Sequence, residues 1–299
     1  MSIESPDLEI DWLVAGAGAA GMTGAVVAHQ LGGSVLVVEK EPVYGGTTAK
    51  SGGVAWIPNN HRQASVQVSD SAEEAYAYLK GLIGDSVSDA RIAAYAQRAS
   101  EMLVFMMQHS HVHYSALPNY MDYYEHVPGY KSGGRSMDNA PINLRKLGPD
   151  AKTIRLGHYD GIMPFNVTVE EGQRLQEMNT GAYWLGLRPV SYTHLRAHET
   201  VLQRIHARRG VLLATGGFSH NAAMRQQYQQ APIGKDWTAA APGATGDAVN
   251  MGEQIGAALD FMECAWWSPT YAIPDGRVLA LIAGKSNPGS IMVHRHGKR

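Results

Sequence analysis

The sequence predicts an α/β fold built around a parallel sheet, on two observations. The first is a strand, a glycine-rich turn, a helix and a second strand within the first 39 residues. The second is an apolar strand after residue 210 that again runs into a glycine turn. Parallel strands with glycine turns at their carboxyl ends are typical of Rossmann-like folds, which bind ligands at that edge of the sheet.

The first elements are a short apolar strand, Trp12 to Ala15, and a helix expected from Met22 to Gln30. Between them the sequence reads G-x-G-x-x-G, the spacing of a dinucleotide-binding turn. The first glycine permits the tight turn, the second lets the backbone approach a pyrophosphate, and the third lets the helix pack on the strand. The helix N-terminus offers N–H groups to phosphates. We therefore expect pyrophosphate contacts at Gly16, Gly18, Ala19, Ala20 and Gly21.

A second apolar strand runs from Val35 to Val38 and ends at Glu39. A carboxylate in this place accepts hydrogen bonds from the adenosine ribose and disfavours a 2′-phosphate, so the motif favours FAD or NAD over NADP. Residues 45–53 then form a run of small and hydroxyl residues, broken only by Lys50. Such a loop can wrap a diphosphate and approach a flat ring system, which favours FAD. The alternative is a flexible linker.

The later elements follow from periodicity and turn residues. Residues 72–108 predict two amphipathic helices with a packing role. Gly210 to Gly217 reads as a buried strand that enters a glycine turn. Thr245-Gly246-Asp247 precedes a helix expected from Ala248 to Leu259, and Asp247 either caps that helix or holds cofactor hydroxyls.

Composition argues against several other classes of protein. A net charge of −2 with 44% hydrophobic residues gives no reason to expect a nucleic-acid partner. The apolar run Trp12 to Ala28 follows acidic residues and contains glycines, so we expect neither a signal peptide nor a membrane span. Cys264 is the single cysteine, which we expect to be buried in a cytoplasmic protein. His109, His111 and His113 alternate as on one strand face, but no carboxylate lies among them and we expect no metal site.

These motifs resemble a flavoprotein group that includes fumarate reductase flavoprotein subunits and 3-ketosteroid dehydrogenases. The shared features are Gly16–Gly21, Glu39-Lys40, Gly45–Ala49, Ser51-Gly52-Gly53, Ala214–Phe218 and Thr245-Gly246-Asp247. Features that resemble the ketosteroid branch are Trp56–Asn60, Asp122-Tyr123-Tyr124 with Pro128-Gly129, Gly134-Arg135-Ser136 and Pro288–Val293. The resemblance covers residues 10–188 and 203–299.

The resemblance implies a Rossmann-like FAD/NAD(P)-binding fold with FAD as the cofactor. Beyond the pyrophosphate turn, the implied cofactor residues are Glu39, Lys40, Gly46, Thr47, Thr48, Ser51, Gly52, Gly53, Ala214, Thr215, Gly216, Gly217, Thr245, Gly246 and Asp247. The implied reaction is dehydrogenation of a 3-ketosteroid, in which a tyrosine takes the proton next to the ketone and the flavin takes a hydride. The identity of the electron acceptor that follows the flavin stays open.

Tyr123 and Tyr124 match the family's N-terminal catalytic tyrosine, and the resemblance does not choose between them. A tyrosine with a pKa of about 10 needs a second hydroxyl or a nearby positive charge to act as a base. The alternative is that both rings pack a loop. Tyr120 is a weaker candidate, and Arg135 resembles a residue of a conformational loop or else makes a surface salt bridge.

Two other functions remain as alternatives. A fumarate- or urocanate-type flavin reductase would need arginines and histidines that hold carboxylates, and the motifs at Trp56–Asn60 and Asp122–Tyr124 argue against it. A non-catalytic flavoprotein fragment is the alternative from a different class.

Two departures from the family bear on the organisation of the chain. Residues 191–200 read SYTHLRAHET, which resembles a translated part of a widely used sequencing adapter. The family has a short β-meander here, so we expect residues 190–202 to be non-native and the meander to be disrupted. The chain also ends before the family's substrate domain is complete. We expect a FAD-binding domain over 1–263, the start of a truncated catalytic domain over 264–299, and an unstable or inactive polypeptide.

Overall fold

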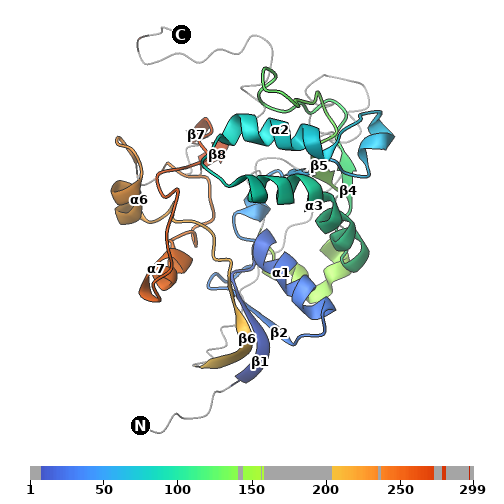
Figure 1. Ribbon diagram of the computed structural model, residues 1–299. Helices are drawn as coiled ribbons and strands as arrows, with labels where there is room; N and C mark the ends of the chain where they lie inside the picture. Colours follow the sequence, from blue (N-terminus) through green and yellow to red (C-terminus); the bar gives the residue numbers. More distant parts are fainter. Residues whose placement is uncertain are drawn as a thin grey trace. The chain divides into compact units, whose positions relative to one another are not determined.

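The computed structural model describes residues 8–140, 144–155, 157, 204–234, 237–272, 278–280 and 296. The chain divides into two compact units (Figure 1). Unit 1 comprises Met1–Lys50, Lys152–Asp160 and Leu195–Arg299, and unit 2 comprises Ser51–Ala151 and Gly161–His194. The decapeptide at 191–200 lies outside the described residues. The domain boundary expected after residue 263 stays a prediction.

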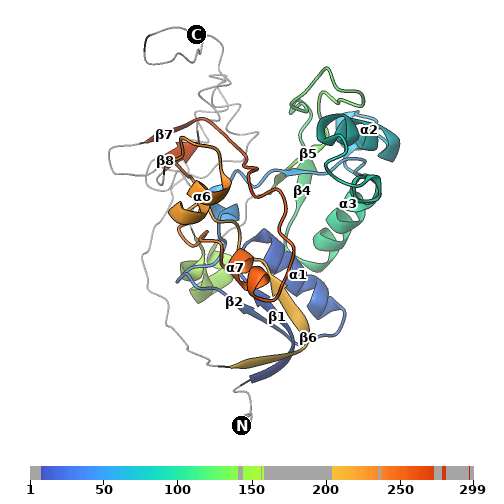
Figure 2. The ribbon, with the colours of Figure 1, turned by 60° about the vertical axis from the view of Figure 1, so that its left-hand side comes forward.

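The sheet of unit 1 confirms the predicted α/β fold. β1 (Leu8–Ala15) lies between β2 (Val35–Val38) and β6 (Ile205–Leu213), and both neighbours run parallel to it. α1 (Ala19–Gln30) connects β1 to β2 and contacts the sheet, as Figures 1 and 2 show. These elements form the βαβ unit that the glycine motif predicts.

β1 begins at Leu8, earlier than the predicted start at Trp12. Glu9 and Asp11 make its first half read as a solvated segment, but Arg208 on β6 neutralises both. Its Nη2 lies 3.1 Å from the Asp11 Oδ1, and its Nη1 lies 3.6 Å from the Glu9 Oε1. Arg208, which is far from β1 in the sequence but lies on the neighbouring strand, therefore makes the acidic segment compatible with a strand.

β6 corresponds to the predicted strand after residue 210, but the prediction that it is buried is wrong. Val211 and Leu212 are 52% and 39% exposed. Within the described part of the chain β6 pairs with β1 alone, so it is an edge strand. An edge strand has a neighbour on one side, which leaves its side chains partly open to solvent.

The rest of unit 1 consists of short elements. They are η1 (Thr48–Lys50), α6 (Ala222–Tyr228), α7 (Asp247–Gln254) and the antiparallel pair β7 (Thr270–Ala272) and β8 (Val278–Ala280). α7 stops short of the predicted Leu259 because Gly256 takes the left-handed conformation, with φ +77°, that ends helices. Cys264 follows in an irregular segment and is exposed, so the prediction of a buried thiol is wrong.

Unit 2 contains the two predicted helices, α2 (Ala72–Ile83) and α3 (Asp89–His109), which pack against each other. The Ser71 hydroxyl caps α2 by accepting from the Glu74 N–H at 3.2 Å. An antiparallel sheet has β5 (Ser136–Asn139) between β3 (Ala55–Trp56) and β4 (Tyr114–Ala116). Its core consists of Ile57, Ala99, Leu103, Ala116 and Met137. The helical turn η2 (Gln63–Val66) also lies in unit 2, and η3 (Leu144–Thr153) begins in unit 2 and ends in unit 1.

α3 continues to His109, so the three alternating histidines do not share a strand face as predicted. The described residues contain no group of His, Cys, Asp and Glu side chains that could hold a metal ion. None of the described helices is long and apolar enough to cross a membrane.

Candidate functional site

The first candidate site is the turn that follows β1. Ala15 lies opposite both Val38 and Leu213, so the three strands end at the same edge of the sheet. Gly16 makes the turn there with φ +104°, and a Cβ on it would lie 2.4 Å from the Ala214 carbonyl oxygen. Only glycine fits, because both the backbone conformation and the space exclude a side chain.

The other two glycines of the motif have different reasons. A Cβ on Gly21 would lie 1.9 Å from the Gly16 carbonyl oxygen, so Gly21 allows α1 to pack against the turn. A Cβ on Gly18 would meet nothing closer than the Thr48 Oγ1 at 3.7 Å. Gly18 therefore keeps the backbone open to the surroundings, as the approach of a pyrophosphate requires.

The amide groups of the turn give a direct test of whether an anionic cofactor fits. The Ala19 N–H donates to the Thr48 Oγ1 at 3.1 Å. The N–H groups of Gly18, Ala20 and Gly21 meet no acceptor among the residues that the structure describes. Unpaired N–H groups at a helix N-terminus form an anion site, so the turn fits the pyrophosphate of FAD.

Glu39 and Lys40 follow β2 and reach different parts of unit 1. The Glu39 carboxylate points at the turn, where its Oε2 accepts from the Ala17 N–H at 2.9 Å. Lys40 Nζ donates to Thr245 Oγ1 and, at 2.6 Å, to the Asp247 carboxylate. The predicted partners Glu39, Lys40, Thr245 and Asp247 thus meet at the carboxyl edge of the sheet.

Asp247 is the first residue of α7, and Gly246 occupies the capping position with φ +84°. No side chain caps this helix, so of the two alternatives for Asp247 the helix cap is wrong. Its carboxylate bonds to Lys40 and Thr245, and the bond from Lys40 holds the pKa of Asp247 below its usual value.

The Gly45–Lys50 segment closes over the turn. The Gly45 N–H donates to the Ala17 carbonyl at 2.9 Å, and a Cβ on Gly46 would lie 3.5 Å from the Gly18 Cα. Thr47 Oγ1 accepts from the Ala241 N–H at 3.0 Å. The segment therefore joins the turn to the loop that contains Ala241. Its glycines keep the approach to Gly18 narrow but free of side chains.

The second glycine turn, Ala214–Gly217, continues the same edge. The Ala214 N–H donates to the Ala15 carbonyl at 2.8 Å, and Thr215 Oγ1 accepts from the Ala248 N–H at 3.0 Å. A Cβ on Gly216 or Gly217 would meet nothing within 4 Å. This turn thus presents open backbone beside the first one.

Arg155 is a member of this region that the sequence did not reveal. Its Nη2 lies 2.6 Å from the Glu41 Oε2, and its buried Nε has no partner within the described ranges. Burial lowers the pKa of Lys50, and the positive charge of Arg155 lowers it further. Arg155 follows Ile154, which pairs with Tyr44 in an isolated bridge. No sequence motif marks this pairing, so the sequence gives no signal for Arg155.

The structure brings most of the expected cofactor residues together in unit 1. The members that meet there are Gly16–Gly21, Glu39, Lys40, Gly46–Thr48, Ala214–Gly217 and Thr245–Asp247. Ser51, Gly52 and Gly53 belong to unit 2, where a Cβ on Gly53 would lie 2.4 Å from the Asn139 Oδ1. Their contribution to the cofactor site stays a prediction.

The second candidate site is the tyrosine loop of unit 2, residues 117–131. Tyr123 and Tyr124 are 67% and 48% exposed, and the Tyr124 ring contacts His126 of the same loop with ring centres 6.2 Å apart. Burial raises the pKa of Tyr120 above its usual value, and its neighbour Tyr123 raises it further. Tyr120 therefore stays protonated at neutral pH.

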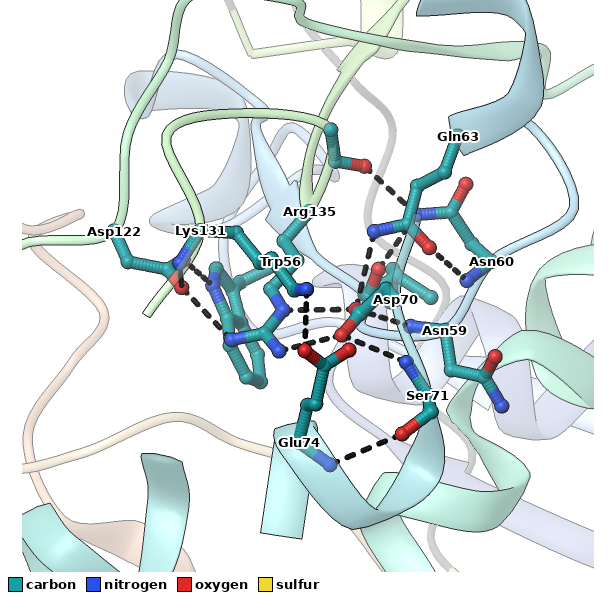
Figure 3. A network of polar contacts seen from close by, with 12 residues as sticks. Trp56, Asn59, Asn60, Gln63, Asp70, Ser71, Glu74, Asp122, Lys131 and Arg135 are labelled. Atoms are coloured by element: carbon teal, nitrogen blue, oxygen red, sulfur yellow. Dashed lines mark hydrogen bonds and ion pairs between the residues drawn. The ribbon is translucent and has the colours of Figure 1, made fainter. Parts of the chain in front are cut away.

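Arg135 is 1% exposed, so the alternative of a surface salt bridge is wrong. Figure 3 shows its polar contacts. Its Nε and Nη2 bond to the Asp70 carboxylate at 2.8 and 2.6 Å, and its Nη1 bonds to the Asp122 Oδ2 at 2.8 Å. The two carboxylates are 0% and 2% exposed. Buried charges persist only when they are paired, so each of these groups depends on the others.

The Asp70 carboxylate shows how strongly the buried cluster favours charge. Burial, the largest effect, raises its pKa, but bonds from Arg135, the Asn59 N–H and Gln63 together outweigh burial and lower it. Asp70 belongs to no motif and was missed by the sequence analysis.

Comparison with known proteins places this geometry in context. The family model described as FAD binding domain matches residues 11–299. The 3-oxosteroid 1-dehydrogenase of Mycobacterium tuberculosis (strain ATCC 25618 / H37Rv) is 38% identical, over 97% of this chain and 62% of its own length. The crystal structure of 3-ketosteroid delta1-dehydrogenase from Sterolibacterium denitrificans, in complex with 1,4-androstadiene-3,17-dione, matches with a TM-score of 0.82 and 30% identity. The match covers 93% of this chain and 60% of the chain in that crystal structure.

A reductase is also among the relatives. The urocanate reductase of Eggerthella lenta is 28% identical over 97% of this chain and 45% of its own length. The chain thus spans about three fifths of the length of the dehydrogenases it matches and less of the reductase.

The match to the Mycobacterium tuberculosis protein also contains a gap. It runs over 350 residues, whereas 97% of this 299-residue chain is about 290 residues. The relative therefore has about 60 residues inside the matched region that have no counterpart here.

Proposed function

This chain belongs to the FAD binding domain family, and from that premise we propose that it is the cofactor-binding part of a 3-ketosteroid dehydrogenase. The exposed Tyr123, with the protonated Tyr120 as its neighbour, carries the proposal. The 38% identity to a 3-oxosteroid 1-dehydrogenase supports the substrate class. The electron acceptor stays unassigned, and a cytoplasmic location stays a prediction.

The residues of unit 1 bind and orient the cofactor. The N–H groups of Gly18, Ala20 and Gly21 bind the pyrophosphate, and the Glu39 carboxylate accepts from the adenosine ribose. When bound, FAD supplies the acceptor for the hydride that leaves the ring carbon next to the site of deprotonation. Open backbone at Gly216 and Gly217 lets the ligand approach the sheet edge.

Tyr123 is the base in this proposal. Its oxygen, in the deprotonated form, takes the acidic proton next to the ketone, and Tyr120 is the neighbouring hydroxyl that would donate to that oxygen. A hydrogen bond to the ionised form of an acid favours ionisation, which is the help that the proposal assigns to Tyr120. The Tyr123 ring is the more exposed of the two, and the Tyr124 ring contacts His126, which favours Tyr123 over Tyr124.

A flavin reductase of the fumarate or urocanate type is the second candidate, supported by the 28% identity to a urocanate reductase. Such an enzyme needs cations free to hold a substrate carboxylate. Arg135 is buried and bonds to two aspartates, so it cannot do this. Arg135 therefore does not support the reductase.

We also propose that residues 190–202 are not native and replace a longer family segment. The adapter-like decapeptide supports this, as do the about 60 residues of the relative that lack a counterpart. Re-amplification and sequencing of the locus from source DNA is the test. A restored family segment is expected, whereas recovery of the same decapeptide codons would contradict the proposal.

The functional assay uses the polypeptide read from the re-sequenced locus, beside the 299-residue chain. Both should bind FAD, and a 3-ketosteroid added without oxygen should bleach the flavin of the first. Bleaching by the 299-residue chain as well would contradict the expectation that it is inactive. Flavin that stays oxidised with ketosteroid, but serves reduction of urocanate or fumarate, would replace the dehydrogenase by the reductase. Bound flavin with neither activity would indicate a non-catalytic flavoprotein.

A further inference from the structure

We propose that Arg135, Asp122, Trp56 and Tyr78 are positioning residues that fix the backbone on both sides of Tyr123 before substrate binds. The inference rests on the proposed function, in which Tyr123 is the base. It joins three motifs that the sequence shows only separately, at Trp56–Asn60, Asp122–Tyr124 and Gly134–Ser136.

The first tether holds the residue before Tyr123. The Asp122 Oδ1 accepts from the Trp56 indole N–H at 2.7 Å, and its Oδ2 accepts from Arg135 at 2.8 Å and from the Lys131 N–H at 3.0 Å (Figure 3). The Asp122 N–H also donates to the Lys131 carbonyl at 3.0 Å. A buried carboxylate with three donors from three segments has one orientation, so the backbone at Asp122 is fixed.

The second tether holds the residue after Tyr123. The Tyr124 N–H donates to the Tyr78 hydroxyl at 3.2 Å, although the Tyr124 ring is exposed. Burial raises the pKa of Tyr78, so its hydroxyl stays protonated at neutral pH. Tyr123 therefore lies between two fixed peptide units while its own ring reaches solvent.

Arg135 connects the two tethers. Its guanidinium carbon lies 5.4 Å from the Trp56 ring centre and 5.5 Å from the Tyr78 ring centre. The two rings are stacked with their centres 6.0 Å apart. The cation thus packs on both aromatic partners of the loop and bonds to Asp122, which couples the two sides of Tyr123.

A purely structural role explains these ions poorly. Apolar residues of similar volume often stabilise a core as well as a buried ion pair does, because burial of charge is costly. What the charges add is a fixed orientation, since the planar guanidinium donates two parallel bonds to the Asp70 carboxylate. A base must lie within hydrogen-bond reach of the proton it removes, so direction is what Tyr123 needs.

The test removes one tether at a time and keeps each ring. Trp56→Phe deletes the indole N–H that bonds to Asp122, and Tyr78→Phe deletes the acceptor for Tyr124. Tyr76→Phe is the matched control, because it deletes a hydroxyl on the same helix that lies near Asp89 and makes no bond to the loop among the described contacts. Amide hydrogen exchange of residues 117–131 is measured in the full chain, and flavin reduction by ketosteroid in the polypeptide from the re-sequenced locus.

We expect each tether variant to raise loop exchange about tenfold and to lower kcat about tenfold with little change in KM, because a misplaced base slows the chemical step. FAD content should not change, and the control should match the wild type. Unchanged exchange overturns the tethering, and faster exchange with unchanged kcat overturns the positioning role. If the unsubstituted protein reduces no flavin with ketosteroid, the proposed function fails, while the exchange result still decides the tethering.

Discussion

The glycine turn of unit 1 and the Arg135 cluster of unit 2 achieve fixed geometry by opposite means. The turn dispenses with side chains at Gly16, Gly18 and Gly21, so that backbone groups pack closely or face a ligand. The cluster uses buried charged side chains, Arg135 and Asp70 among them. The comparison teaches that backbone sites depend on local spacing, whereas side-chain networks depend on contacts between distant segments.

The largest expected effect tests the cluster. Arg135→Met leaves the buried carboxylates of Asp70 and Asp122 without their cation, and removal of one partner of a buried ion pair costs about 3–5 kcal/mol. Urea unfolding followed by circular dichroism measures the loss.

Arg98→Met is the control for this substitution, because Arg98 and its partner Glu101 are exposed. It should cost less than about 0.5 kcal/mol. If Arg135→Met costs no more than the control, the cluster does not stabilise unit 2, and the contrast between the two regions loses its energetic basis.

The next effect separates the glycines of the turn. Gly21→Ala places a Cβ against the Gly16 carbonyl, so we expect a loss of about 3 kcal/mol in stability and the loss of bound FAD. Gly18→Ala has room for its methyl group. It should keep the fold and weaken FAD binding about tenfold, because the methyl group stands where the pyrophosphate approaches.

Unfolding midpoints and the Kd for FAD, measured on both variants, decide the point. Equal Kd values for Gly18→Ala and the unsubstituted chain would show that the pyrophosphate does not approach this backbone. Equal stability for Gly21→Ala would show that the helix can shift away from the turn.

The sequence predicted the glycine turn well for a physical reason. Strand, turn and helix are neighbours in the chain, and each glycine has a steric cause that acts over a few residues. The helices of unit 2 were predictable from their apolar spacing, which is also local. β1 was predicted too short because its acidic residues are neutralised by Arg208, which lies far along the chain.

The cluster could not be predicted in the same way. Arg135 and Asp70 are 65 residues apart, and neither spacing nor composition marks them as partners. Arg135 stood in a recognisable motif, yet its burial depends on Trp56 and Tyr78 from other segments. The exposure of Cys264 and of the β6 side chains likewise depends on which elements cover them, which a single segment does not contain.

The smallest effect is a pH dependence that refines the account of the cluster. The folded-state pKa of Asp70 lies below its ordinary value of 3.8, so its charge stabilises the fold at pH values above 3.8. That contribution is lost as the pH falls from there through the folded-state pKa. Asp70→Asn keeps the shape but not the charge, and we expect a loss of about 2 kcal/mol at pH 7.

The difference in unfolding free energy between Asp70→Asn and the unsubstituted chain should therefore narrow as the pH is lowered from 7 toward 3. Below the folded-state pKa the protonated aspartic acid and the asparagine are alike in charge, so the two proteins converge. Asp85→Asn, at an almost fully exposed carboxylate, should show no comparable narrowing. If the difference in unfolding free energy between Asp70→Asn and the unsubstituted chain does not change with pH, the asparagine destabilises the fold through packing and not through the lost charge. Packing, and not charge, would then stabilise the cluster.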